Sequence, residues 1–248
     1  MLNDMKINLR TFCFLFISGI LLCGFIPAKE KKAELSIRFL PVFNGTPLLL
    51  AETAYNTESG DSIFIDQFKC YLSNFELKGE RTNFKSHEAF LLDAEDSTSL
   101  ILQLKDLDEG NYADLVFNIG VDSLANVSGA LDGALDPVNG MYWAWNTGYI
   151  NAKLTGRSPT CKTLHNAFEF HIGGYLPPFK TLKKARLKLD GFTIIPNEIN
   201  ELVILIELSE WFKNPEPIKL SKTNSIVMPD KNAVMMAENY SDMFYLSK

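Results

Sequence analysis

The chain has 248 residues, of which 46% are hydrophobic and 22% charged, so it has enough apolar material for a sizeable core and is not a disordered chain. Its 24 Lys and Arg against 30 Asp and Glu give a net charge of -6, the wrong sign for a protein that binds the phosphates of nucleic acid. Only 3 histidines and 4 cysteines are present, which excludes zinc ribbons, iron–sulfur clusters and sites built from many imidazoles.

Residues 1–28 have the pattern of a secretory signal: a basic start, an uncharged apolar run and a charged boundary at Lys29. We expect cleavage near Ala28. Two alternatives stay open, lipid attachment at Cys23 or retention of the run as a membrane anchor, although the run is at the lower limit of the length that spans a bilayer. The mature protein is expected to be exported to the periplasm or the outer-membrane surface and to meet the membrane only through its signal or lipid.

Two cysteines follow the signal, Cys70 and Cys161. In an oxidising compartment such a pair forms either a disulfide or two buried thiols, and both alternatives stay open. A thiol catalyst is not expected, because neither cysteine has the CxxC or helix-opening context that lowers a thiol pKa.

Short segments that alternate apolar and polar residues recur along the mature chain, with turn residues between them. No linker or internal repeat divides the chain, so we expect one domain over residues 33–248, a mostly β, single-domain β-sandwich with long ordered loops. The predicted strands are 35–39, 48–51, 62–73, 74–78, 89–92, 112–119, 141–154, 167–172, 185–195 and 202–208.

A short C-terminal helix is predicted after Asp230, where apolar residues recur at intervals of three and four. The residues that carry this pattern are Ala233, Met236, Ala237, Tyr240 and Phe244.

The stretch 120–140 is rich in Gly, Asp and Asn and lacks periodicity, which predicts a long ordered loop. Its polar side chains could supply oxygen ligands to calcium, but their spacing is not that of an EF-hand, and we favour turns held by the side chains themselves. These residues are Asp122, Asn126, Asp132, Asp136 and Asn139.

Enzyme motifs are missing: the sequence has no GxSxG, P-loop, GxGxxG or HExxH. The carboxylates Asp61, Glu169 and Asp190 have no spacing that favours acid–base chemistry. We therefore expect a protein that is not an enzyme.

The segment 140–156 contains Trp143 and Trp145, two residues apart on a predicted strand and hence on the same face as Met141. A wall of the core is one interpretation. The other is a functional site, because two buried indoles would each need a hydrogen-bond partner for N–H.

A second strand, 167–172, places Phe168, Phe170 and Ile172 on one face and His171 on the other, just before Gly173 and Gly174. A lone histidine is more often structural than a ligand. The two glycines nevertheless permit close approach of other groups, so His171 is a candidate ligand. His87 and His165 lie in polar, loop-like contexts and are expected to be exposed.

Several blocks together resemble the MbnP-like family, secreted proteins similar to the copper-binding protein encoded beside methanobactin genes. The blocks are PVFNGTPL, FKCYLSNFEL, FNIGVDSLANVSGALDGALDPVNGMYWAWNTGYINAKLTG, FEFHIGGY and AENYSDMF. The resemblance implies an exported copper-binding β-protein in which a tryptophan is oxidised to kynurenine by a partner di-haem protein of the cytochrome c peroxidase type.

Carried onto this chain, the resemblance makes Trp143 or Trp145 the modified residue and His171 a copper ligand. The family pattern also has a histidine two residues after the modified tryptophan, but here those positions are Trp145 and Thr147. One expected ligand is therefore missing, and further imidazoles would have to come from elsewhere. The alternative function is a non-catalytic envelope binding module that holds its ligand on the aromatic strip without a metal.

Overall fold

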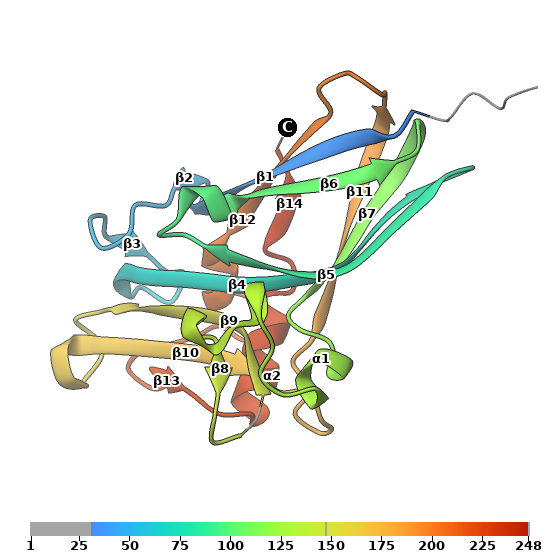
Figure 1. The fold of residues 1–248 in the computed structure, drawn as a ribbon. Coiled ribbons are helices and arrows are strands. Elements are labelled where there is room, and N and C mark those ends of the chain that lie inside the picture. The colour runs from blue at the N-terminus through green and yellow to red at the C-terminus, as the bar shows by residue number, and fades with distance from the viewer. Residues whose placement is uncertain (1–30, 147, 248) are drawn as a thin grey trace, which may run out of the picture. The chain divides into compact units, whose positions relative to one another are not determined.

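Residues 31–146 and 148–247 are described by the computed structural model, and they form two β-sheets packed as a sandwich (Figure 1). The signal-peptide and lipidation predictions fall on residues outside this part of the chain. The smaller sheet has the order β14-β12-β1-β2, with β6 also paired to β1. Its strands are β1 (Ala33–Phe43), β2 (Thr46–Pro47), β6 (Ile101–Leu107), β12 (Glu201–Glu207) and β14 (Phe244–Leu246).

The larger sheet has the order β11-β7-β4-β9-β10-β13, with β3 and β5 paired to β4 and β8 paired to β9. The predicted mostly β sandwich is thereby confirmed. The strands of this sheet are β3 (Tyr55–Asn56), β4 (Ser62–Gly79), β5 (Asn83–Asp93), β7 (Gly110–Ile119), β8 (Tyr142–Trp143), β9 (Gly148–Arg157), β10 (Ala167–Gly173), β11 (Lys183–Ile194) and β13 (Ser225–Ile226).

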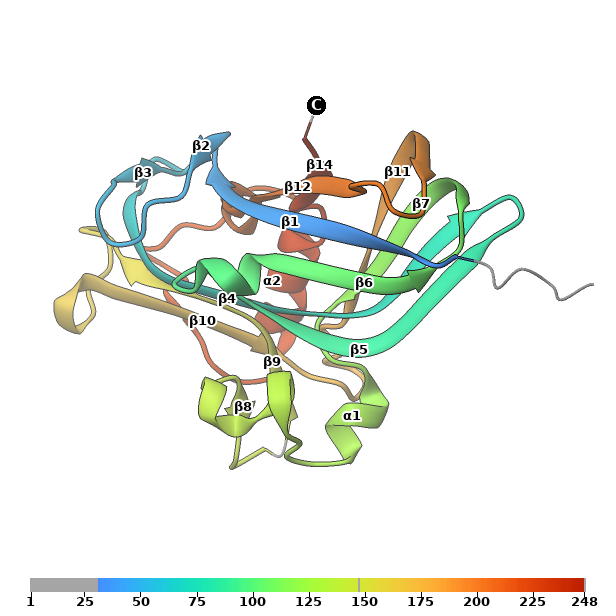
Figure 2. The ribbon, with the colours of Figure 1, turned by 45° about the horizontal axis from the view of Figure 1, so that its top comes forward.

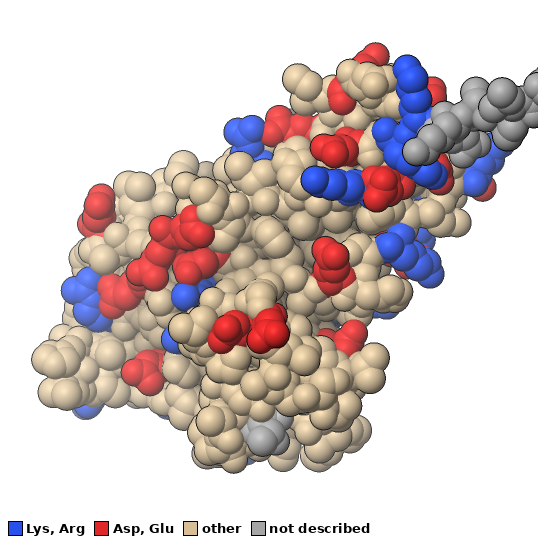
Figure 3. Space-filling view, in the orientation of Figure 1, with Lys and Arg blue, Asp and Glu red and all other residues tan. Residues whose placement is uncertain are grey.

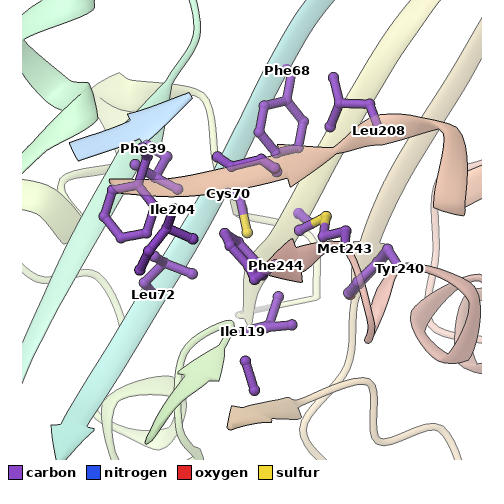
Figure 4. Close-up of a cluster of buried hydrophobic side chains, with 14 of the residues drawn as sticks. Phe39, Phe68, Cys70, Leu72, Ile119, Ile204, Leu208, Tyr240, Met243 and Phe244 are labelled. Atoms are coloured by element: carbon purple, nitrogen blue, oxygen red, sulfur yellow. The ribbon is translucent and has the colours of Figure 1, made fainter. Parts of the chain in front are cut away.

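The main core lies between the two sheets and follows from the alternation of the strands. In β1, Leu35, Ile37 and Phe39 are fully buried while the residues between them are at least partly exposed. From the opposite sheet, Phe68 and Cys70 of β4 point into the same cluster (Figure 4). Because each strand places every second residue in this space, the hydrophobic effect fixes which face of each sheet is inside.

The C-terminal helix α2 (Lys231–Tyr240) is confirmed and packs against β10 and the 3-10 helix η5 (Leu208–Phe212). Figure 2 shows it behind β1 and β6. Asp230 caps the helix by accepting a hydrogen bond from the backbone N–H of Ala233 at 2.8 Å. Phe244 was included in the helical pattern, but the helix ends earlier and Phe244 belongs to β14, where it enters the core.

The long strand β4 positions the loop 120–140. Along one edge of β4, β9 pairs with residues 64–70 and β7 with residues 72–79, while β5 pairs along the other edge. The chain leaves β7 where these two neighbours separate, and Gly120 N–H donates to the Tyr71 carbonyl oxygen at 2.7 Å. The loop therefore starts over the middle of the larger sheet, on the side away from the main core.

Cys70 and Cys161 are free, buried thiols. Of the two alternatives, the structure therefore has two buried thiols and no disulfide between them. Cys70 lies in β4 between Leu92 of β5 and Ala152 of β9, with its side chain in the main core. Burial raises the pKa of the Cys70 thiol far above its usual value. Among the described residues no helix is long and apolar enough to cross a membrane.

Candidate functional site

The loop 120–140 covers a second, smaller hydrophobic cluster on the outer side of the larger sheet. The loop contains α1 (Ser123–Val127) and the 3-10 helices η2 (Gly133–Leu135) and η3 (Pro137–Asn139). The loop is thus ordered, as predicted, and it shields an aromatic cluster that is separate from the main core. The buried members of the cluster are Tyr71, Val121, Leu135, Met141, Trp143, Tyr149 and Ile150.

Polar side chains of the loop hold its own turns. Asp122 accepts from the Ala125 N–H at 2.9 Å and caps α1, and Asp136 accepts from the Val138 N–H at 2.8 Å. Asn139 donates to the carbonyl oxygens of Gly133 and Ala134. These side chains therefore hold the turns of the loop, which is the role that the sequence favoured over calcium binding. Asp132 caps η2 without a side-chain hydrogen bond.

Two side chains fasten the loop to the sheet. Asn126 accepts from the Tyr149 N–H at 2.9 Å and donates to the Val121 carbonyl oxygen at 3.0 Å. The Tyr149 hydroxyl donates to the Leu135 carbonyl oxygen at 2.9 Å and accepts from the Leu131 N–H at 3.0 Å. Together these bonds fix the position of the loop 120–140 over the aromatic cluster.

Replacing Tyr149 with Phe should lower the free energy of unfolding by about 1–2 kcal/mol, because the hydroxyl bonds three loop backbone groups and its loss leaves the Leu131 N–H without its partner. Urea unfolding of both proteins measures the change. Tyr142→Phe is the control, since no hydrogen bond of the Tyr142 hydroxyl to a described residue is present. Equal stability of Tyr149→Phe and the wild type would contradict the fastening role.

The two tryptophans lie at a hairpin rather than along one strand. β8 ends at Trp143, which pairs with Gly148 of β9, and Trp145 lies in the connecting turn. The predicted continuous strand 141–154 is therefore wrong, and the Asn146 N–H closes the turn on the Trp143 carbonyl oxygen at 3.2 Å. The rings still meet, with centroids 5.6 Å apart at 44°. Trp143 is 6% exposed and Trp145 64%, so only one of them is a buried indole.

Trp143 packs over Gly173 at the end of β10. A Cβ at Gly173 would lie 2.7 Å from Trp143 Cζ3 and 2.5 Å from the Tyr149 carbonyl oxygen, so only glycine allows this contact. Gly173 and His171 are two residues apart on the same strand and hence on the same face, with Cα atoms about 6.6 Å apart. The indole of Trp143 thus lies over the position two residues after His171, on the same face of β10.

His171 is half-buried on the face away from the main core, while Phe168, Phe170 and Ile172 are fully buried on the other, which confirms the predicted alternation. It pairs with Lys153 of β9, which in turn pairs with Lys69 of β4. Burial, aided by the nearby Lys153 ammonium, lowers the pKa of His171 to about 4. The imidazole is therefore neutral at physiological pH, the form that binds metal ions.

Replacing Lys153 with Met should raise the pKa of His171, because one of the two causes that lower it is the ammonium charge. An NMR titration of the imidazole signals measures this change. A His171 midpoint that Lys153→Met leaves unchanged would contradict the contribution of this charge.

The lowered pKa of His171 also affects the stability of the wild type. Between about pH 6.5 and 4 the unfolded state binds more protons than the folded state, so the free energy of unfolding should fall as the pH falls through this window.

Asn151 links three segments around the site. It is the extra residue of a bulge in β9, since Ala152 pairs with Ile172 whereas Ile150 pairs with Gly173. Its carboxamide accepts from the Val121 N–H at 2.9 Å and donates to the Thr181 hydroxyl at 2.9 Å. This role was not predicted from the sequence, where the available signal was an asparagine between Ile150 and Ala152 in a predicted strand.

A cavity of about 300 Å³ lies beside Trp145. Its walls are mostly apolar and include exposed large side chains. Figure 3 shows few charged side chains over this end of the molecule, where α1 and β8 lie. The lining residues are Trp145, Asn146, Gly174, Tyr175, Leu176, Pro177, Phe179, Met228 and Pro229.

The remaining histidines are exposed, as predicted, and no group of three or more His, Cys, Asp and Glu side chains in the described residues is arranged to hold a metal ion. His165 has a left-handed backbone, φ 58°, in η4 (Leu164–Asn166), and His87 lies on β5 with Nδ1 3.1 Å from Asn74 Oδ1. A metal ion at His171 would therefore have few protein ligands, and the others would have to come from the aromatic cluster.

Fold and site together define a β-sandwich protein with an aromatic cluster and one half-buried histidine on the outer face of its larger sheet. The chain belongs to the MbnP family, whose sequence model matches residues 32–233. The solved structure of MbnP from Methylosinus trichosporium is similar, with a TM-score of 0.53 and 17% identity, over 82% of this chain and 87% of that chain. A comparison with curated proteins finds no significant match.

Proposed function

We propose that this protein is an exported copper-binding protein, and not an enzyme, whose metal site includes His171 and an oxidised form of Trp143. Membership of the MbnP family supports a role connected with copper. The single observation that carries the proposal for this chain is the packing of the Trp143 ring over Gly173, which lies two residues after His171 on the same face of β10.

The chemistry of the two side chains supports this pairing. A neutral imidazole binds copper without first losing a proton, and burial keeps His171 neutral. Intact indole nitrogen is a poor ligand. Oxidative cleavage of the indole C2–C3 bond inserts two oxygen atoms, from one dioxygen or from two molecules of peroxide that are reduced to water at a di-haem partner, and gives a formamide. Hydrolysis of this formamide by water releases formate and gives kynurenine, whose aromatic amine is a ligand.

Trp143 is the better candidate for coordination and Trp145 the more accessible ring. Trp143 touches the strand that carries His171, while Trp145 is largely exposed and stacks against Trp143. A haem partner that docks at this end of the protein would meet Trp145 first.

Copper titration of the mature protein, made with and without the di-haem partner, tests the proposal, together with mass spectrometry of the peptide that contains both tryptophans. In the co-produced protein we expect kynurenine at residue 143, so the peptide should be heavier by the difference between one oxygen atom and one carbon atom. The copper affinity should rise with this change. Binding no tighter than micromolar in co-produced protein would contradict the proposal.

A second candidate function is metal-free binding of an apolar ligand, which the cavity beside Trp145 favours. Its aromatic and aliphatic walls are typical of small-molecule sites. Quenching of tryptophan fluorescence by an apolar ligand, lost in Trp145→Ala and unaffected by copper, would support this function over the first.

A further inference from the structure

A pocket on the larger sheet, outside the aromatic cluster, has the features of a binding site. Its volume is about 170 Å³. It lies where β4 meets both β5 and β7 out of register, and Asn74 at this bulge has a left-handed backbone with φ 53°. Bulges of this kind are common beside sites because they interrupt the pairing of the strands and turn side chains toward a new direction.

Asn118 lies in the wall of this pocket and keeps its carboxamide free for a ligand. The residue is 7% exposed, and its carboxamide makes no hydrogen bond to any described residue. The fully buried side-chain polar atoms that lack a partner in the described part of the chain are Trp211 Nε1 and Tyr240 OH, so the Asn118 carboxamide is not sealed in the protein. It is open to the pocket, where a ligand or water can bond to it. Asn118 belongs to β7, where Ser73 and Lys184 are its neighbours across the sheet.

The charged side chains of the pocket leave one cation available. Lys85 pairs with Glu76, at 2.9 Å, and Glu76 also pairs with Lys78. Lys184 lines the pocket from β11 and forms no ion pair with a described residue. An anionic group can therefore gain the Lys184 ammonium without breaking an existing pair.

His87 supplies an acceptor at the same pocket. Asn74 donates its amide N–H to Asp122 Oδ2 at 3.1 Å, which turns its Oδ1 toward His87 Nδ1, 3.1 Å away. Nδ1 then carries a proton, and in the tautomer with its only proton on Nδ1 the other nitrogen, Nε2, is an acceptor. Together with the acceptor-only carboxylate of Glu76, this nitrogen favours a ligand that has O–H donors as well as anionic oxygens.

We propose that this pocket binds a hydrogen phosphate group, either inorganic phosphate or a phosphate monoester. Lys184 and the Asn118 amide receive the anionic oxygens, and His87 or Glu76 accepts from the phosphate O–H. Sulfate has the same size and shape but no O–H at neutral pH, so it binds more weakly at this pocket. This site is independent of the copper proposal.

Calorimetric titration of the mature protein with inorganic phosphate, glycerol phosphate and sulfate tests the proposal. We expect saturable binding of phosphate or the monoester, at least about tenfold weaker binding of sulfate, and at least about tenfold losses in Lys184→Met and Asn118→Leu. Lys188→Met is the matched control, because Lys188 lies on the same strand but pairs with Asp114, and it should bind as the wild type does.

NMR of the wild-type side-chain amides keeps the test valid if Asn118→Leu fails to fold, since phosphate should shift the Asn118 signals. Preference for the monoester would identify an organic phosphate, and preference for inorganic phosphate the free ion; both support the site. No saturable binding, equal affinity for sulfate, equal loss in Lys188→Met or unmoved Asn118 signals would overturn it.

Discussion

Replacing His171 with Gln should weaken copper binding by at least about a hundredfold in protein that carries the oxidised tryptophan, equivalent to about 2.8 kcal/mol. His171 is a half-buried histidine on β10, the strand that Trp143 contacts at Gly173, and the described residues contain no group of three or more His, Cys, Asp and Glu side chains that could replace it. Half-burial on the outer face means that Gln fits without disturbing the main core. Competition with a copper chelator of known affinity measures the loss.

The matched control is His165→Asn, which removes an exposed imidazole from a left-handed backbone position that Asn also adopts readily. It should leave copper affinity unchanged. If the two variants bind copper equally well, His171 is not a ligand and the proposed site is wrong.

Replacing Gly173 with Ala should lower the free energy of unfolding by about 1–3 kcal/mol and also separate the two indoles. The new Cβ would lie 2.5 Å from the Tyr149 carbonyl oxygen and 2.7 Å from Trp143 Cζ3, so the ring must move. Two rings 5.6 Å apart at 44° couple their electronic transitions, which gives a paired signal in circular dichroism. We expect this signal to weaken, and copper affinity to fall with it.

Gly148→Ala is the control for a glycine in the same hairpin. Its Cβ would meet Asn126 Oδ1 at 3.5 Å and Tyr175 Cε1 at 3.6 Å, which are ordinary contacts. A Gly173→Ala protein with wild-type stability and an unchanged dichroism signal would show that the Trp143 ring does not depend on Gly173.

Strand alternation made much of the fold predictable from the sequence, since β1 and β10 each have a buried face that is fixed by period-two spacing. The predicted strand 48–51 is wrong, because these residues lie in an irregular segment and a turn after β2. β6 was missed because, in this strand beside β1, only Leu104 and Leu107 are buried and the alternation is weak. Pairing could not be predicted: β1 lies parallel to β12 more than 150 residues away along the chain, with Ile37 opposite Leu202, and nothing local encodes that partner.

The site was predictable in composition but not in geometry. The spacing of Trp143 and Trp145 indicated neighbouring rings, but a turn that is closed by Asn146, and not a straight strand, brings them together. The contact between Trp143 and Gly173 joins segments thirty residues apart along the chain, and it depends on the Asn151 bulge. The role of Asn118 was not predicted, because a polar residue in a strand does not reveal from the sequence whether it has a partner.

Anomalous X-ray diffraction at the copper edge, from crystals of the copper-loaded protein made with its haem partner, is the most direct test of the central claim. The account predicts one strong peak about 2 Å from a ring nitrogen of His171 and within bonding distance of the aromatic amine at residue 143. A copper peak elsewhere on the protein, or bound copper with no peak at His171, would contradict it.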